Sequence, residues 1–201
     1  KGVAASTVKK VGILGAGMMG QGIAYVSAMA GIEVVLKDIS LDAAEKGKAY
    51  SVRVLDKQIA RGRMVESEKS RVLDLIQATA EDEALRGCDL IVEAVFENFT
   101  LKNKITAATE KYLAVDGIWG SNTSTLPITK LAEVSANKNN FIGIHFFSPV
   151  DKMALVEIIC GKKTSDETLA RTFDYVCQIN KIPIVVNDSP GFFTSRVFGQ
   201  Q

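Results

Sequence analysis

Two kinds of segment alternate along the chain: short apolar runs and longer stretches with apolar positions at helical spacing. The apolar runs are rich in β-branched residues, as expected of strands that are buried on both faces of a sheet. They cover residues 8–14, 33–38, 90–95, 118–121, 141–147, 154–160 and 184–186. Helical patterns follow the first run up to about residue 30 and recur at residues 101–113, 127–136 and 166–179. This order predicts a doubly wound α/β sheet that is mostly parallel.

Residues 42–78 do not fit a minimal unit of this kind. The segment is charged and predicts an insertion of two helices, a helical hairpin that turns near Arg61-Gly62-Arg63. Its first helix has few acids and carries the basic residues Lys46, Lys48, Arg53, Lys57, Arg61 and Arg63. Two interpretations stay open, a solvated hairpin and an arm that contacts a large anionic substrate, because charge alone does not separate them.

A glycine-rich turn separates the first apolar run from the first helical pattern. Gly15, Gly17 and Gly20 form a G-x-G-x-x-G sequence, and Asp38 ends the next strand 18 residues after Gly20. In a dinucleotide-binding unit these glycines allow the tight turn, backbone approach to a pyrophosphate and close helix packing, in that order. The helix N-terminus offers N–H groups to the phosphates, and the acid accepts from ribose hydroxyls. We therefore predict a Rossmann-type dinucleotide site; the alternatives are a glycine turn without a ligand and an FAD-binding unit.

Asp38 also bears on the choice of dinucleotide. Its carboxylate would repel the 2′-phosphate of NADP, so the sequence favours NAD as the cofactor. Lys37 is the one nearby cation, and in an alternating strand it points to the opposite face.

His145 is the single histidine of the chain. The connection between its strand and the next is too short for a crossover helix, so the two strands should pair antiparallel. A turn centred near Asp151 then places His145 opposite Glu157, within side-chain reach. A lone strand histidine is more often structural, but a histidine–carboxylate pair beside a dinucleotide site has the form of a general base with its orienting partner.

Composition narrows the function classes without naming one. The net charge of +1 over 201 residues argues against a nucleic-acid or membrane surface as partner. Three widely spaced cysteines in apolar runs predict reduced thiols. The sequence contains no apolar run of about 18 residues and no signal peptide, so we expect no membrane span and a cytoplasmic or matrix-like compartment.

Six stretches of the chain resemble one family. GAGMMGQGIA, VEAVFEN, SNTSTLPI, HFFSPV, LVEII and VVNDSPGFF are similar to motifs of the L-3-hydroxyacyl-CoA dehydrogenases of fatty-acid β-oxidation, as in bacterial multifunctional enzymes. The resemblance runs from about residue 9 to residue 198, in the family's order and spacing. It implies oxidation of an L-3-hydroxyacyl-CoA to the 3-ketoacyl-CoA, with NAD⁺ taking the hydride and no metal site.

The resemblance also implies roles by position. His145 matches the general base, Glu157 its carboxylate partner and Ser124 a serine beside the reacting oxygen and the nicotinamide. Positions that match cofactor contacts are Gly15, Gly17, Met18, Met19, Gly20, Asp38, Val95, Glu97, Lys102, Asn122, Ser124 and Ser148. Positions that match substrate contacts are Ser51, Lys57, Ser124 and Ser195. Without the resemblance, Glu97 and Lys102 read as a solvated loop pair, and Asn122 and Ser124 as capping or turn residues before Pro127.

Two positions depart from the family pattern. Ser148 and Ser195 stand where the family usually has asparagine, which predicts retained chemistry with an altered rate or substrate preference.

The resemblance also frames the domain organisation. We expect residues 1–7 to be a linker remnant, residues 8–196 the NAD-binding catalytic domain, and residues 197–201 the start of a C-terminal helical domain. The expected partners are an acyl-CoA, that helical domain, and a second copy or a multienzyme complex. Open alternatives are a dehydrogenase of another hydroxyacid, a dinucleotide sensor, and a cofactor-binding piece that is inactive without its helical domain.

Overall fold

The computed structural model describes residues 2–189 and residue 192. Within them the chain forms one sheet in the order β3-β2-β1-β4-β5-β6-β7-β8. Neighbouring strands are parallel except β6 and β7, which are antiparallel. The strands are β1 Lys10–Leu14, β2 Glu33–Lys37, β3 Ile76–Thr79, β4 Cys88–Glu93, β5 Leu113–Ser121, β6 Phe141–Phe146, β7 Leu155–Cys160 and β8 Ile182–Asn187. The predicted doubly wound, mostly parallel α/β sheet is confirmed.

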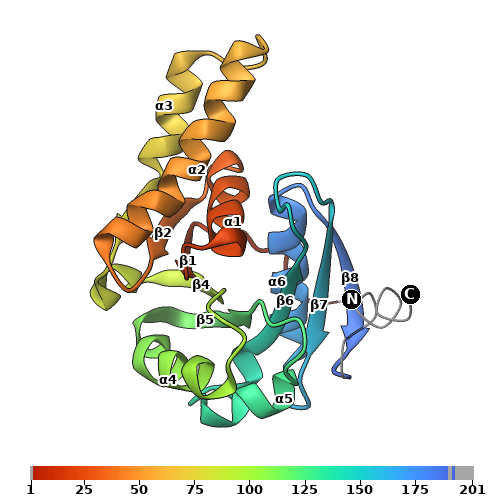
Figure 1. Cartoon of the computed structure of the whole chain (residues 1–201). Helices are drawn as coiled ribbons and strands as arrows, with labels where there is room; N and C mark the ends of the chain where they lie inside the picture. The colour runs from red at the N-terminus through yellow and green to blue at the C-terminus, as the bar shows by residue number, and fades with distance from the viewer. Residues whose placement is uncertain (1, 190–191, 193–201) are drawn as a thin grey trace, which may run out of the picture.

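Helices lie on both faces of this sheet (Figure 1). They are α1 Met18–Met29, α2 Leu41–Ala60, α3 Glu66–Asp74, α4 Phe99–Thr109, α5 Ile128–Leu131 and α6 Asp166–Gln178. Four 3₁₀ turns complete the described part of the chain: η1 Asp82–Leu85, η2 Glu110–Tyr112, η3 Ala132–Val134 and η4 Lys138–Asn140. None of the described helices is both long and apolar enough to cross a membrane.

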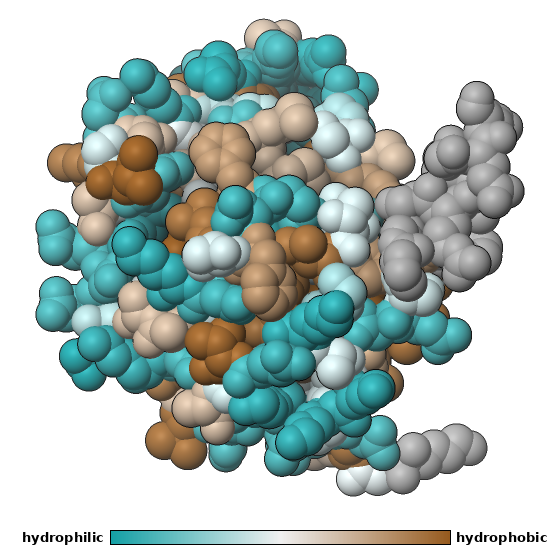
Figure 2. All heavy atoms as spheres, turned by 60° about the horizontal axis from the view of Figure 1, so that its bottom comes forward, coloured by the Kyte–Doolittle hydropathy of each residue, from teal (hydrophilic) through white to brown (hydrophobic). Residues whose placement is uncertain are grey.

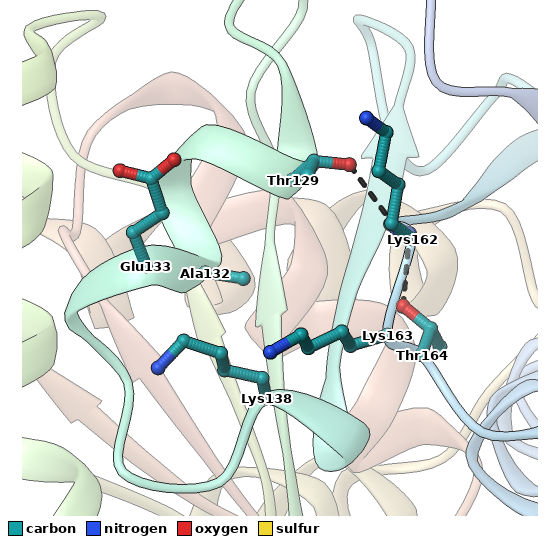
Figure 3. A pocket seen from close by; sticks show the side chains of 8 residues that line it. Thr129, Ala132, Glu133, Lys138, Lys162, Lys163 and Thr164 are labelled. Atoms are coloured by element: carbon teal, nitrogen blue, oxygen red, sulfur yellow. Dashed lines mark hydrogen bonds between the residues drawn. The ribbon is translucent and has the colours of Figure 1, made fainter.

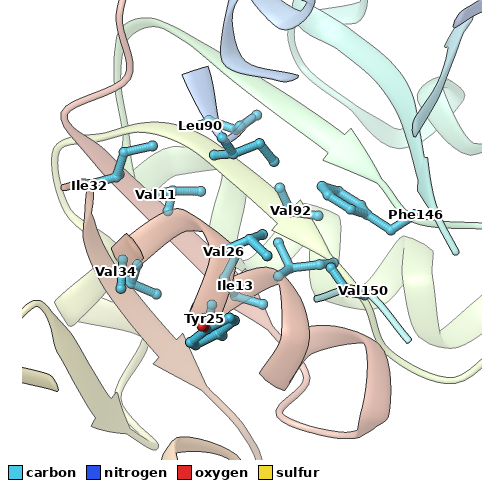
Figure 4. Packing of buried hydrophobic residues seen from close by; sticks show 14 of the residues in the cluster. Val11, Ile13, Tyr25, Val26, Ile32, Val34, Leu90, Val92, Phe146 and Val150 are labelled. Atoms are coloured by element: carbon cyan, nitrogen blue, oxygen red, sulfur yellow. The ribbon is translucent and has the colours of Figure 1, made fainter. Parts of the chain in front are cut away.

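Alternate residues of the central strands feed two hydrophobic clusters. Val34 and Leu36 of β2 join the cluster under α1, whereas Val35 joins the cluster on the other face, which α5 covers. Strands that bury both faces in this way are apolar at nearly every position, which is why the sequence showed runs rather than alternation. Figure 4 shows the first cluster, where Val26 and Tyr25 of α1 lie over β1 and β2.

The charged insertion is a helical hairpin, as predicted. Ser40 caps α2, its Oγ accepting from the Ala43 N–H at 3.1 Å. The turn to α3 contains Gly62 with φ +67°, a conformation that suits glycine. In Figure 1 α2 and α3 run side by side away from the sheet.

Three predicted boundaries were wrong. Residues 76–79 belong to strand β3, not to the helical insertion, because they pair in parallel with β2; four residues are too few for a periodic signal. The predicted helix at 127–136 is one α-helical turn followed by the 3₁₀ turn η3. Strand β5 begins at Leu113, five residues before the predicted start at residue 118. Its pairing with β4 shifts register between Cys88 and Leu90, and the pattern of apolar and polar residues does not indicate such an irregularity.

Candidate active site

The glycine turn connects β1 to α1, with Gly17 as the N-cap of the helix. Gly15 has φ +94°, and a Cβ there would lie 2.6 Å from the Ala94 carbonyl oxygen. A Cβ at Gly20 would lie 1.7 Å from the Gly15 carbonyl oxygen, so the helix could not keep its place. A Cβ at Gly17 would meet nothing within 4 Å. The structure thus separates two glycines that the fold requires from a third that faces open space.

Asp38 follows β2 and is tied to the glycine turn. Its Oδ2 accepts from the Ala16 N–H at 2.7 Å, and its Oδ1 accepts from the Ile39 N–H at 2.6 Å. Lys37 is held elsewhere, since its Nζ lies 3.0 Å from Asp82 Oδ1. The carboxylate therefore stands beside the turn without a cation from Lys37, as the sequence predicted.

His145 and Glu157 face each other across β6 and β7, in the predicted register. His145 Nδ1 lies 3.9 Å from Glu157 Oε2, an ion-pair distance that is longer than a hydrogen bond. Glu157 is fully buried and His145 is 7 % exposed, with the Phe147 ring centroid 4.6 Å from that of the imidazole. Burial lowers the pKa of His145, and the negative charge of Glu97 partly opposes this. The imidazole is thus neutral near pH 7, the form that a general base needs.

The hairpin that carries this pair packs against the dinucleotide helix. A Cβ at Gly22 of α1 would lie 2.7 Å from Cβ of Val150, in the turn between β6 and β7. Ser148 Oγ lies 3.5 Å from Sδ of Met18, the first residue of α1. The fold therefore brings the histidine hairpin next to the glycine turn, although more than 100 residues separate them.

Glu97 connects the loop after β4 with the loop after β5. One carboxylate oxygen accepts from the Ser124 N–H at 2.8 Å and from Ser124 Oγ at 2.9 Å, and the other accepts from Thr123 Oγ1 at 2.8 Å. Burial alone would raise the pKa of Glu97, but these bonds and the Lys102 charge outweigh it and lower the pKa. Glu97 is therefore an ionised group that holds Ser124.

Asn122 and Ser124 do not cap α5, so the capping part of that alternative is wrong. Asn122 Oδ1 accepts from the Phe146 N–H at 2.9 Å and so binds the strand of His145. The first N–H groups of α5 are bound instead by Asp188, which accepts from Ile128 and Thr129 at 2.8 and 2.9 Å.

Lys102 is buried, which overturns the interpretation of a solvated pair with Glu97. It lies on α4, and its Nζ is 2.6 Å from Glu93 Oε2 and 3.7 Å from Glu97 Oε1. The Val95 carbonyl oxygen accepts from the same ammonium at 3.2 Å. Glu93 was not among the predicted site residues. Its one indication in the sequence is that it is an acidic residue at the end of an apolar strand.

Two predicted substrate residues, Ser51 and Lys57, differ in exposure. Ser51 is buried in α2, and its Oγ has no hydrogen-bond partner among the described residues. Lys57, six residues later, is exposed. Ser195 and residues 197–201 lie outside the described residues.

The remaining predicted cofactor positions border the glycine turn and the strand ends. Met18 is 66 % exposed at the N-terminus of α1, and Met19 is half-buried beside it. Val95 is half-buried after β4, where its N–H donates to Glu93 Oε2 at 3.0 Å. Figure 2 shows apolar side chains among the polar surface of one face of the molecule.

A pocket of about 240 Å³ lies apart from these residues. Lys138, Lys162 and Lys163 border it together with Thr129 and Thr164, and none of the predicted site residues does (Figure 3). The candidate site is therefore defined by the strand ends and the glycine turn and not by this pocket.

The chain matches known proteins over most of its length. Residues 10–189 match the family model described as 3-hydroxyacyl-CoA dehydrogenase, NAD binding domain. The chain is 44 % identical over 194 residues to the fatty acid oxidation complex subunit alpha of Idiomarina loihiensis, covering 96 % of this chain and 27 % of that protein. A solved structure of (S)-3-hydroxybutyryl-CoA dehydrogenase from Ralstonia eutropha has a TM-score of 0.92 and 42 % identity, over 96 % of this chain and 68 % of that one.

The extent of these matches decides what they establish. The family model covers most of the chain, whereas the chain spans about a quarter of the curated relatives' length, including the Colwellia psychrerythraea subunit at 27 %. The chain belongs to the 3-hydroxyacyl-CoA dehydrogenase family, as its NAD binding domain.

Proposed function

We propose that the protein oxidises L-3-hydroxyacyl-CoA to 3-ketoacyl-CoA with NAD⁺ in fatty-acid β-oxidation. The observation that carries the proposal is the hairpin of His145 and Glu157 packed against helix α1, which begins at the glycine turn. A dinucleotide sensor would have use for the glycines and Asp38, but none for a neutral buried imidazole facing a carboxylate.

The residues of the turn fit NAD. The open space at Gly17 admits a pyrophosphate, and the first N–H groups of α1 are aligned to bind it. Asp38 is positioned to accept from ribose hydroxyls and to repel a 2′-phosphate. Val95, Glu97, Lys102, Asn122, Ser124 and Ser148 complete the proposed cofactor edge. When bound, NAD⁺ supplies the hydride acceptor.

The proton step falls to His145. Its imidazole takes the proton of the 3-hydroxyl as the C3 hydride leaves, and the Glu157 carboxylate stabilises the imidazolium that results. Ser124, whose Oγ donates to Glu97 at 2.9 Å, is the proposed serine beside the substrate oxygen. The buried setting of His145 excludes water from this exchange.

The helical hairpin is the proposed acyl-CoA arm. Its basic residues suit the phosphates of CoA, and the exposed Lys57 is the proposed contact on this arm, with Ser195 on the acyl side. Ser51 is buried, so a contact from its Oγ to CoA would require the helix to shift. We further propose the domain limits 1–7, 8–196 and 197–201, a C-terminal helical domain that closes the cleft, and assembly as a homodimer or in a multienzyme complex. The free thiols Cys88, Cys160 and Cys177 support a cytoplasmic compartment.

Oxidation of reduced dinucleotide by acetoacetyl-CoA tests the proposal. The full-length protein should consume NADH with acetoacetyl-CoA, and about tenfold or more slowly with NADPH or with free acetoacetate. The 2′-phosphate of NADPH would be repelled by Asp38, and free acetoacetate lacks the phosphates that the basic arm would bind. Absorbance at the nicotinamide band measures the rate. Equal rates with acetoacetate would point to another hydroxyacid, and equal rates with NADPH would remove the role of Asp38.

The pH profile of the oxidation should reflect the lowered pKa of His145. The ordinary pKa of histidine is about 6.5, and burial lowers it, so the neutral base persists to below that pH. We expect kcat/KM for L-3-hydroxybutyryl-CoA to stay level on acidification to below about pH 6.5 and then to fall. A decline that begins above pH 7 would show that the imidazolium is favoured in the site.

A further inference from the structure

Glu93 is an acidic residue that lies buried at the centre of the sheet. It is the last residue of β4, in the middle of the sheet, and its side chain is 1 % exposed. A carboxylate at such a position loses its hydration and must be compensated by a cation and hydrogen bonds.

The compensation comes from three directions. Oε2 lies 2.6 Å from Lys102 Nζ on α4 and accepts from the Val95 N–H at 3.0 Å. Oε1 accepts from Ser121 Oγ at 2.7 Å, across the pairing of β4 with β5. One side chain thus joins the end of β4, the end of β5 and the first half of α4.

Lys102 carries the connection onward. Its side chain is 3 % exposed, and its ammonium lies between the Glu93 and Glu97 carboxylates. Glu97 in turn accepts from both the N–H and the Oγ of Ser124. Charges therefore alternate from the buried end of β4 to the loop that bears Ser124.

We propose that Glu93 is a positioning residue, which fixes the Lys102 ammonium so that Lys102 and Glu97 hold the cofactor edge and Ser124. This inference rests on the proposed function. Glu93 acts through Lys102 and makes no contact of its own with dinucleotide or substrate, because its carboxylate is buried.

A double-mutant cycle in the full-length protein tests this. Glu93→Gln keeps the shape and leaves the ammonium without its buried counter-charge, so NADH affinity should fall about tenfold or more. Lys102→Met should also weaken binding. The double variant should bind NADH as well as Lys102→Met does, because the function of Glu93 is already lost with the lysine. NADH fluorescence gives the affinity, and a melting curve of each variant gives its stability.

A matched control separates positioning from general stability. Glu110 also ties two segments, accepting from Ser135 Oγ and the Ala136 N–H at 2.7 Å, but it lies before β5, at the opposite end of that strand from Ser121. Glu110→Gln should lower the melting temperature and leave NADH affinity unchanged. If Glu93→Gln does not fold, Ser121→Ala removes one bond to Glu93 without unbalancing a charge and should weaken NADH binding by a few-fold.

The outcomes are distinct. Unchanged NADH affinity in folded Glu93→Gln and Ser121→Ala, or a double variant that multiplies the two single losses, would overturn the inference alone. Failure of the unmodified protein to bind NADH would overturn the proposed function and the inference together.

Discussion

Replacing His145 with glutamine should lower turnover by about 10²- to 10⁴-fold, the usual contribution of a general base, while leaving NADH affinity nearly unchanged. Glutamine has similar size and polarity but takes up no proton near neutral pH. The imidazole lies in the β6–β7 hairpin and not in the glycine turn, so the dinucleotide contacts should survive.

The measurement is NADH oxidation with acetoacetyl-CoA, read beside NADH fluorescence in the same sample. Cys160→Ala is a suitable control, since Cys160 belongs to the same hairpin, where it pairs with Ile142, and has no assigned role. It should retain full activity. If His145→Gln kept most of its activity, another group would be the base, and the proposed roles of His145 and Glu157 would be wrong.

Alanine at Gly20 should destabilise the fold, whereas alanine at Gly17 should leave the fold stable and weaken NADH binding. At Gly20 the new Cβ would lie 1.7 Å from the Gly15 carbonyl oxygen, so α1 must move away from β1. Overpacking of this kind typically costs 1–3 kcal/mol of unfolding free energy, and a backbone atom cannot yield as a side chain does, so we expect more than about 3 kcal/mol.

At Gly17 the new Cβ meets nothing within 4 Å and the backbone has φ −72°, which alanine adopts freely. The unliganded protein should lose no more than about 1 kcal/mol, the cost of a poorer N-cap. NADH affinity should nevertheless fall about tenfold or more, because the methyl group occupies the space that a pyrophosphate needs.

Thermal melts with and without NADH distinguish the two variants. The expected pattern is a destabilised Gly20→Ala and a stable Gly17→Ala that NADH no longer protects. A Gly17→Ala protein that NADH stabilises as it does the unmodified one would show that the dinucleotide does not approach at this point.

The chain's local patterns were enough for the glycine turn and the histidine hairpin. The role of Gly20 follows from a clash with the Gly15 carbonyl oxygen inside the turn, and that of Gly15 from its positive φ, so spacing alone reveals them. The close approach of Ala94 to Gly15 depends on the sheet. The pairing of His145 with Glu157 follows from a connection too short for a crossover and from the two-residue period of strands. The observed 3.9 Å separation did not follow, because register fixes which residues are opposite but not how their side chains are turned.

Patterns failed where segments are short or irregular. Residues 76–79 became a strand because β2 offered an unpaired edge, which outweighs any local preference in four residues. The early start of β5 depends on a register shift that leaves no periodic trace.

The sequence by itself determined the fold class, the dinucleotide turn, the facing histidine and glutamate, and the resemblance that names the family. Each rests on residues close in the chain or on a short turn, where covalent geometry leaves few arrangements. Only the tertiary structure decided that Lys102 is buried between Glu93 and Glu97, that Asn122 binds the histidine strand, and that Ser51 and Lys57 differ in exposure. Those facts depend on how helices and loops pack over the strand ends, because packing, and not the local pattern, sets which long-range side chains meet and which lose their water.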